Sequence, residues 1–256
     1  MNTKLFNISL IKYEIRNLMG NIFAIAFGLF FPIVMSLLMS NVIGSQVPAE
    51  ARETVVVSIF ITTSLIIPLA TVLVGYAVSF SQELEKEIPL RLSLFGYKES
   101  ILIISKISAS LIFMTISVIA YTAVNYIVLK LPMPTIGSAL VLIISLYALA
   151  VVLFILSHGI ALFFKKFGPT YAITMSLYFV IMLLSGLFGI QAKDFPKTIR
   201  LISYMFSTTY MNSDFANFWT GGSYNFIPII QSFIFLGAVS CIVLFVALNR
   251  NSRKIK

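Results

Sequence analysis

Two long stretches without a charged residue constrain the fold of this chain more than any other feature. Residues 17–49 and 54–82 carry no Asp, Glu, Lys or Arg, and each is longer than the roughly 20 apolar residues with which a helix crosses a bilayer. Across the whole chain 59% of residues are hydrophobic, 11% are charged and the mean hydropathy is +1.00. A water-soluble domain could not bury so much apolar surface, so the sequence predicts an integral membrane protein.

The apolar runs predict an all-α membrane protein with six transmembrane helices, forming a single transmembrane domain over residues 1–256. The helices are expected near residues 20–43, 54–82, 101–128, 137–164, 170–190 and 226–248. Before the first of them, a more polar segment has apolar residues at helical spacing, which predicts a helix lying in the membrane interface. The apolar stripe of that segment, over residues 3–18, is Leu5, Ile8, Ile11, Ile15 and Leu18.

The distribution of positive charge predicts the orientation in the membrane. Six spans place both termini on one side, and the segments expected on that side hold 13 of the 18 Lys and Arg residues. Since cytoplasmic loops of membrane proteins are rich in Lys and Arg, both termini are predicted to be cytoplasmic. The net charge of +9 therefore reflects membrane orientation, and no nucleic-acid partner is expected.

The segment between the second and third spans, residues 81–99, concentrates charge in an otherwise apolar chain. Pro89 suits the first turn of a helix, because its missing N–H would be unpaired there, and Gly96 suits the residue just past a helix end. The pattern predicts a short cytoplasmic helix over Leu90–Phe95. Leu92 and Phe95 are expected to be exposed and to contact another protein.

Residues 191–225, between the fifth and sixth spans, are too polar to cross the membrane and too apolar for a free loop. The pattern predicts amphipathic helices that lie at the outer interface or dip into it. Aromatic residues mark membrane interfaces, so Phe215, Phe218 and Trp219 are expected at the depth of the lipid headgroups.

Several kinds of chemistry find no support in the sequence. No Asp or Glu falls in the central part of a predicted span, which argues against an ion-coupled carrier. No phosphate-binding loop, hydrolase nucleophile motif or metal-ligand spacing occurs, so no catalytic and no metal-binding residue is predicted. Lys106 is expected to reach the inner interface, and Cys241 to be a small residue with no disulfide partner. His158 could sense pH or touch substrate, but a bond to a nearby backbone carbonyl is the favoured interpretation.

Three segments in this order resemble the membrane subunit, or permease, of type-2 ATP-binding-cassette (ABC) exporters. The N-terminal segment is similar to the connecting helix of that family. Residues 83–102, ELEKEIPLRLSLFGYKESIL, resemble its charged loop with the coupling helix, although many members have Gly or Thr where this chain has Pro89. Residues 185–189, SGLFG, followed by Phe195-Pro196 and Ile202-Ser203-Tyr204, resemble the external re-entrant region before the sixth span.

The resemblance implies a complex of two permeases with two ATP-binding subunits in a bacterial cytoplasmic membrane. The second permease would be another copy of this chain or a close paralogue. ATP and Mg²⁺ would be bound by the partner ATPase, so this chain needs no cofactor and is not itself an enzyme. The coupling helix would dock into the ATPase through the residues Glu87, Leu90, Arg91, Leu92, Phe95 and Gly96.

The fifth span carries a polar face that is a candidate for the substrate path and the dimer interface. The residues Tyr171, Thr174, Tyr178 and Ser185 follow one another at helical spacing, and in the family this helix and the first line the conduit. Hydrogen bonding between helices explains the same pattern equally well.

Three functions remain open on the sequence. The first is ATP-driven export of an amphipathic substrate, most simply a peptide such as a toxin or an antimicrobial peptide. The second is an ABC permease for a lipid-linked glycan, a drug or an ion. The third is a membrane scaffold or channel that works without an ATPase.

Overall fold

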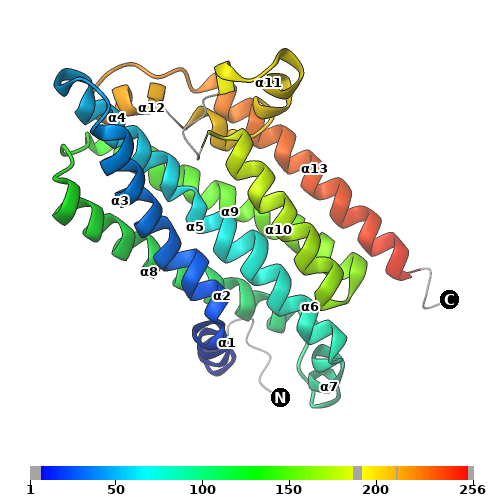
Figure 1. The fold of residues 1–256 in the computed structure, drawn as a ribbon. Helices are drawn as coiled ribbons and strands as arrows, with labels where there is room; N and C mark the ends of the chain where they lie inside the picture. The colour runs from blue at the N-terminus through cyan, green and yellow to red at the C-terminus, as the bar shows by residue number, and fades with distance from the viewer. Residues whose placement is uncertain (1–6, 187–191, 212, 253–256) are drawn as a thin grey trace.

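The computed structural model describes residues 7–186, 192–211 and 213–252, and this part of the chain is helical throughout, with short connections (Figure 1). Six helical stretches within it are long and apolar enough to cross a membrane, as the sequence predicts. They are Ala26–Gly44, Ala49–Glu85, Glu99–Leu129, Ile136–Phe164, Phe167–Leu184 and Ile227–Asn251. Residues 187–190, predicted as the end of the fifth span, lie outside the described residues, as do residues 187–189 of the SGLFG segment.

Several of these stretches consist of more than one helix. The first comprises η1 (Ala26–Phe30) and α3 (Phe31–Gly44), and α2 (Ile22–Ile25) precedes it. The second comprises α4 (Ala49–Ser64), α5 (Ile66–Pro68), η2 (Leu69–Tyr76) and α6 (Ala77–Glu85). The others are α8 (Glu99–Leu129), α9 (Ile136–Phe164), α10 (Phe167–Leu184) and α13 (Ile227–Ser252).

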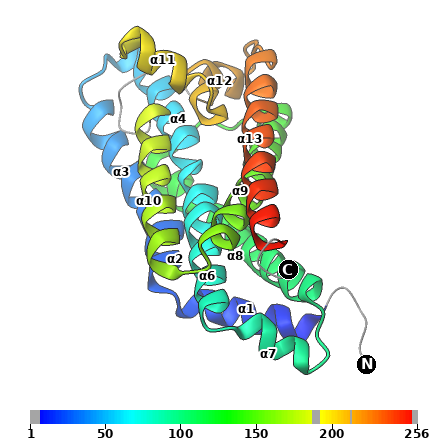
Figure 2. The same ribbon diagram turned by 90° about the vertical axis from the view of Figure 1, so that its right-hand side faces the viewer.

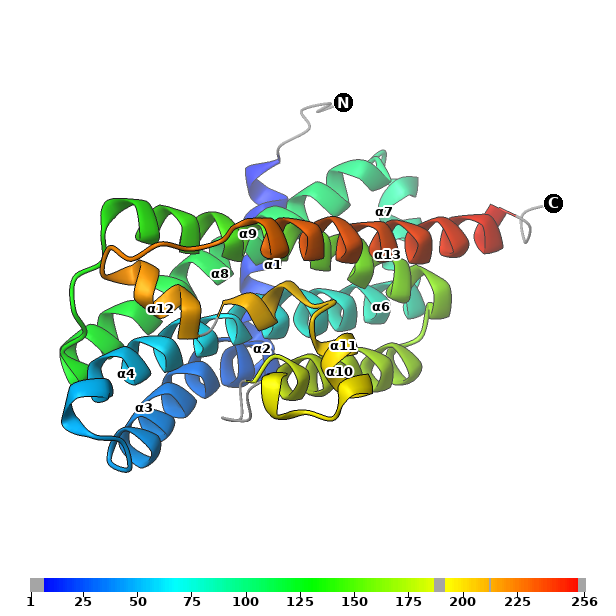
Figure 3. The same cartoon turned by 90° about the horizontal axis from the view of Figure 1, so that it is seen from above.

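The second stretch is the central helix of the bundle. In its most apolar part 83% of residues are buried, against 22–44% in the other five stretches, and every residue from Phe60 to Ser81 is buried. At one end of this helix, α6 lies between α9 and α10 (Figure 3). A helix that is apolar on every side and surrounded by other helices has this burial pattern, whereas the outer helices expose one face to lipid.

Two π-helical segments, η1 and η2, meet inside the bundle. Pro68 immediately precedes η2 and Pro32 follows η1, and proline disturbs the regular hydrogen bonds of a helix. A Cβ atom on Gly28 would lie 2.6 Å from Cγ2 of Thr71, so only glycine allows η1 to approach η2 this closely. π-helical segments are frequent at functional sites, and this contact makes the region between η1 and η2 a candidate for one.

The two ends of the bundle carry different short helices (Figure 2). At one end, α1 (Ile8–Gly20) lies across the bundle, and α7 (Ile88–Leu94) lies at the same end; we call this the α7 end. At the opposite end, the α11 end, lie α11 (Lys197–Ser203) and α12 (Ser213–Trp219). The short helices η3 (Ala192–Asp194) and η4 (Ser207–Tyr210) flank α11.

At the α11 end, α12 is built into the bundle rather than resting on its surface. Phe215 and Trp219 are buried, and the ring of Trp219 lies edge-on to that of Phe60, with centroids 5.7 Å apart. Nε1 of Trp219 donates a hydrogen bond to the carbonyl oxygen of Pro132 at 3.2 Å. Other helices therefore surround these two rings, and their position at headgroup depth stays a prediction.

The close packing of α9 on α13 at Gly159 provides a test of the fold. A Cβ atom there would lie 2.9 Å from the backbone nitrogen and 3.0 Å from Cα of Leu244. We expect Gly159→Leu to force the two helices apart and to lower the free energy of unfolding by about 1–3 kcal/mol. Thermal unfolding in detergent measures this. Gly137→Leu in the same helix is the control, since its Cβ meets nothing within 4 Å; an equal loss in both variants would contradict the packing.

Candidate functional site

The helix α7 is set off from its neighbours by two left-handed residues. Glu87 has φ 54° and redirects the chain after α6, and Pro89 occupies the first turn. Past the helix end, Gly96 has φ 84°, its N–H bonds the carbonyl of Ser93 at 2.9 Å and the N–H of Tyr97 bonds that of Leu92 at 3.1 Å. This pair of bonds is the Schellman motif, which ends helices at glycine. The expected places of Pro89 and Gly96 are confirmed, while the helix begins two residues earlier than predicted.

The outer surface of α7 is apolar. Leu90, Leu94 and Phe95 have exposed fractions of 59%, 82% and 79%, and we call these three side chains the α7 patch. The prediction that Leu92 is exposed is wrong: it is partly buried. Leu90 and Leu94 are four residues apart and share a helix face, whereas Leu92 lies between them in sequence and points elsewhere. Among the other predicted docking residues, the structure places Glu87, Arg91 and Gly96 in exposed positions.

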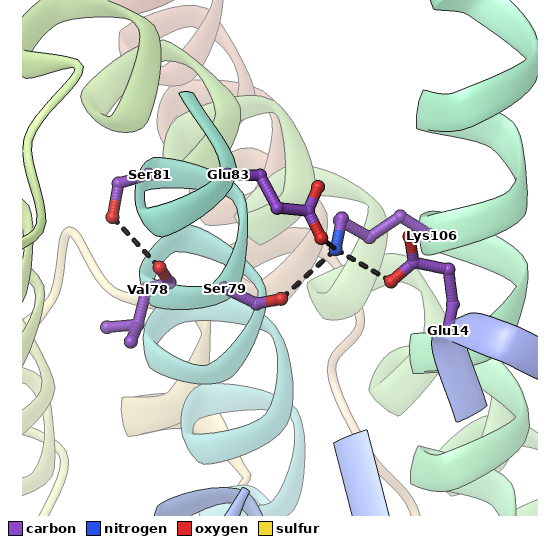
Figure 4. Close-up of polar contacts among 6 residues, drawn as sticks. All are labelled: Glu14, Val78, Ser79, Ser81, Glu83 and Lys106. Atoms are coloured by element: carbon purple, nitrogen blue, oxygen red, sulfur yellow. Dashed lines mark hydrogen bonds and ion pairs between the residues drawn. The ribbon is translucent and has the colours of Figure 1, made fainter. Parts of the chain in front are cut away.

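Charged residues from the helices on either side of α7 in the chain, and from α1, form a buried group that joins three helices (Figure 4). Nζ of Lys106 in α8 lies 2.7 Å from Oε2 of Glu14 in α1 and 2.6 Å from Oε1 of Glu83 in α6. The same Nζ donates to Oγ of Ser79 at 3.0 Å. We call these four residues the Lys106 cluster.

The Lys106 cluster shows contacts that the sequence did not reveal. Lys106 is 3% exposed and pairs with Glu14 and Glu83 instead of facing water, while its position at the inner interface stays a prediction. On α1, the buried face includes Glu14 and Leu18, while Ile8 of the predicted apolar stripe is 80% exposed. A stripe drawn through apolar residues alone leaves out Glu14, because its burial depends on a cation that is distant in sequence.

A second polar contact joins α6 to α10. Oε2 of Glu85 accepts a hydrogen bond from the backbone N–H of Phe167, the first residue of α10, at 2.9 Å. A carboxylate at a helix N-terminus satisfies an unpaired N–H and interacts favourably with the helix dipole. The helix before α7 is thus connected to α1 and α8 through Glu83 and to α10 through Glu85.

A cavity of about 400 Å³ opens beside the Lys106 cluster. Its walls come from the end of α1, from α2 and η1, from η2 and α6, and from α10. Near the α7 end its lining is polar, and nearer the middle of the bundle it is apolar. The polar lining includes Arg16, Asn17, Asn21, Ser79 and Gln82, and the apolar lining includes Phe27, Val74, Val78 and Met175.

The four residues predicted for the substrate path do not stay together in the structure. Tyr171 and Tyr178 line the cavity. Thr174 is buried and donates its hydroxyl to the carbonyl of Thr170 in its own helix at 2.8 Å. Ser185 is hydrogen-bonded to Thr208 beside η4, at the α11 end. Residues of α1 share the cavity with α10, which no pattern in the sequence indicates.

His158 bonds a different partner from the one predicted. Its Nδ1 lies 2.8 Å from the hydroxyl of Tyr76, and its ring stacks on Phe80 with centroids 4.8 Å apart. The expectation of a backbone carbonyl is therefore wrong. The histidine joins α9 to the central helix and does not line the cavity.

The sequence model of a known family matches this chain. The description of that family is ABC-2 type transporter, and the match covers residues 7–218. The chain belongs to the ABC-2 type transporter family. No curated protein matches the chain. The matched region of this ABC-2 permease contains α1, α7, the Lys106 cluster and the cavity, so these four features lie in the part that the family shares.

Membership makes the chain the membrane-spanning permease subunit of an ABC transporter. Members of this family typically work with a separate ATP-binding cassette subunit. Of the three functions left open by the sequence, a scaffold or channel that works without an ATPase therefore agrees least with the family of this permease.

Proposed function

We propose that this permease couples ATP hydrolysis by a separate ATP-binding cassette subunit to the export of an amphipathic substrate, most simply a peptide. The observation that carries the proposal is the α7 patch. Three large apolar side chains stand exposed on a short helix that is fixed at both ends. Exposed apolar patches of this kind mark contacts with partner proteins or with a membrane, and the exposed charges of Glu87 and Arg91 beside this one favour a protein partner.

The proposed docking surface combines the α7 patch with charged residues beside it. Leu90, Leu94 and Phe95 would enter an apolar cleft of the ATPase subunit, and the exposed residues Glu87 and Arg91 would form the polar rim. Binding energy at protein interfaces concentrates in a few large, well-packed side chains. Two permeases, as two copies of this chain or with a paralogue, would bind two ATPase subunits, and those subunits would hold ATP and Mg²⁺.

The α7 end would face the cytoplasm of a bacterial cell. The excess of Lys and Arg in the segments at this end supports that orientation. It would place α1 at the inner interface as the connecting helix, α7 as the coupling helix, and α11 and α12 at the outer side. The burial of Trp219 supports a re-entrant role for α12, since part of this outer segment reaches between the spans.

The cavity supports an amphipathic substrate. Its polar end lies beside α1, where a charged or hydrogen-bonding group of the substrate would stay near water. Its apolar end, at Phe27, Val74 and Met175, would receive a hydrophobic side chain or acyl chain. A volume of about 400 Å³ is that of a site for a small molecule or for part of a larger one. A longer peptide would therefore place one segment in the cavity of each of the two permeases. The alternative substrate is a lipid-linked glycan or a drug.

The experiment is purification of the tagged permease together with its ATPase subunit, followed by ATP hydrolysis measurements in lipid vesicles. We expect a cationic amphipathic helical peptide to stimulate ATP hydrolysis several-fold, because substrate binding in the cavity would favour the permease conformation in which the ATPase subunits hydrolyse ATP. A scrambled peptide of equal charge that forms no apolar face is the control. Stimulation by a glycolipid without stimulation by either peptide would replace the peptide with the alternative substrate, and absence of any ATPase subunit would overturn the proposed function.

A further inference from the structure

The Lys106 cluster has a charge balance that structural stability alone does not explain. One ammonium group faces two carboxylates, and the exposed fractions of the side chains are 4% for Lys106, 9% for Glu14 and 13% for Glu83. Removing such charges from water costs free energy that their attraction only partly returns, so buried ion pairs are poor stabilisers compared with apolar contacts. What the cluster does supply is fixed geometry among α1, α6 and α8.

The Lys106 cluster lies on the two helices that flank α7 in the chain. α7 is connected directly to α6 on one side and to α8 on the other. The contact between Glu83 and Lys106 bridges these two helices close to α7, so that a displacement of α7 acts on α6 and α8 together. Glu14 then adds α1, which lies across the same end of the bundle (Figure 2).

The same residues reach the wall of the cavity. Arg16, Asn17 and Leu18 follow Glu14 within about one turn of α1, and all three line the cavity. Ser79 both accepts the hydrogen bond from Lys106 and lines the cavity. A movement that passes through Lys106 into α1 would therefore change the shape of the polar end of the cavity.

We propose that Lys106 is a positioning residue which, through Glu14, makes α1 move with α6, α7 and α8 and so changes the cavity when the ATPase subunit displaces α7. This inference rests on the proposed docking role of α7. The ion pair with Glu14 transmits the movement to α1, and the ion pair with Glu83 keeps α6 and α8 together. Leu18 and Ala109 add an apolar contact region between α1 and α8, but apolar surfaces slide past one another more readily than an ion pair of fixed geometry.

Two matched substitutions separate the two arms of the cluster. Glu14→Met removes the arm to α1 and leaves Glu83 paired one-to-one with Lys106. Glu83→Met removes the arm to α6 and leaves Glu14 paired one-to-one with Lys106. Each variant keeps an electrically balanced buried pair, so neither strands an unpaired charge.

The measurement is the rate at which a membrane-impermeant maleimide labels a cysteine in the cavity wall. Asn17→Cys in a Cys241→Ser background gives a single reactive site. The permease is reconstituted with its ATPase subunit in lipid vesicles, and the ratio of labelling rates with and without ATP and Mg²⁺ is recorded. We expect this ratio to differ from one with the native cluster, to fall to one with Glu14→Met, and to keep its native departure from one with Glu83→Met.

A second cysteine separates the failure of this inference from the failure of the proposed function. Ser93→Cys in α7, in the same background, should be protected from maleimide by the ATPase subunit with both the native cluster and Glu14→Met. If protection is missing with the native cluster, the proposed docking of α7 is wrong. If protection is present in both while the Asn17→Cys ratio still responds to ATP in Glu14→Met, the role of Lys106 is wrong and the proposed function stands.

A further variant keeps the inference testable if Glu14→Met fails to assemble. Glu14→Gln retains an oxygen that can accept a hydrogen bond from Lys106 but removes the charge. We expect the ratio of labelling rates at Asn17→Cys, with and without ATP and Mg²⁺, to lie between its value with the native cluster and a value of one, which means no response. A full native response in Glu14→Gln would show that the charge of Glu14 is not needed and would overturn the inference.

Discussion

Replacing Phe95 by aspartate is expected to weaken binding of the ATPase subunit roughly thirtyfold. Phe95 follows the last residue of α7 and is 79% exposed, so the change removes an apolar contact and places a charge in the proposed interface from a position outside the helix body. Central aromatic residues at interfaces contribute about 2 kcal/mol or more, and each 1.4 kcal/mol corresponds to a factor of about ten in affinity. The measurement is a titration of the permease in lipid nanodiscs with purified ATPase subunit.

The matched control for this substitution lies at the other end of the molecule. Leu201 in α11 is a large apolar residue that is 60% exposed, and the proposed orientation puts it on the outer side. Leu201→Asp should leave the affinity for the ATPase subunit unchanged. Equal affinities of Phe95→Asp and the native permease would show that α7 is not the docking element.

Replacing Lys106 by methionine is expected to lower the free energy of unfolding by about 3–5 kcal/mol. The substitution leaves Glu14 and Glu83 facing each other in a buried site with no cation, and breaking a buried ion pair on one side typically has a cost of this size. Thermal unfolding in detergent measures the effect. Lys98→Met is the control, because Lys98 is exposed just before α8.

A triple substitution distinguishes the loss of Lys106 from damage to packing. In Lys106→Met with Glu14→Met and Glu83→Met, no charge remains in the buried site. Since apolar residues of similar volume replace buried ion pairs at little cost, we expect most of the stability to return. A triple variant as unstable as Lys106→Met alone would mean that shape, rather than charge, determines the effect.

The number and type of helices could be predicted from the sequence because they follow from local properties. Uncharged runs such as residues 54–82 are sufficient to predict a spanning helix wherever it packs. Proline and glycine act in the same local way, and Pro89 and Gly96 lie at the two ends of α7 as predicted. The outward face of α7 was harder to predict, because it depends on how the helix packs against the bundle: Leu94 belongs to the exposed surface and Leu92 does not.

The Lys106 cluster and the cavity could not be predicted because they depend on contacts between distant parts of the chain. Glu14 and Lys106 are separated by 92 residues, and each one alone resembles an ordinary charge at a membrane interface. The cavity likewise combines α1 with α10, so a helical face drawn on α10 alone placed Thr174 and Ser185 with Tyr171 and Tyr178. At the α11 end, the burial of Trp219 follows from the position of α12 between the spans, which its aromatic composition does not reveal.

The most direct test of the account is the ATP dependence of transport by the purified permease in lipid vesicles, measured with and without its ATPase subunit. We predict that uptake of a labelled cationic amphipathic peptide into inside-out vesicles requires the ATPase subunit, ATP and Mg²⁺ together, and that Phe95→Asp lowers it severalfold at subunit concentrations that just saturate the native permease. Transport by the permease alone, at a rate that the subunit and ATP do not change, would contradict the account.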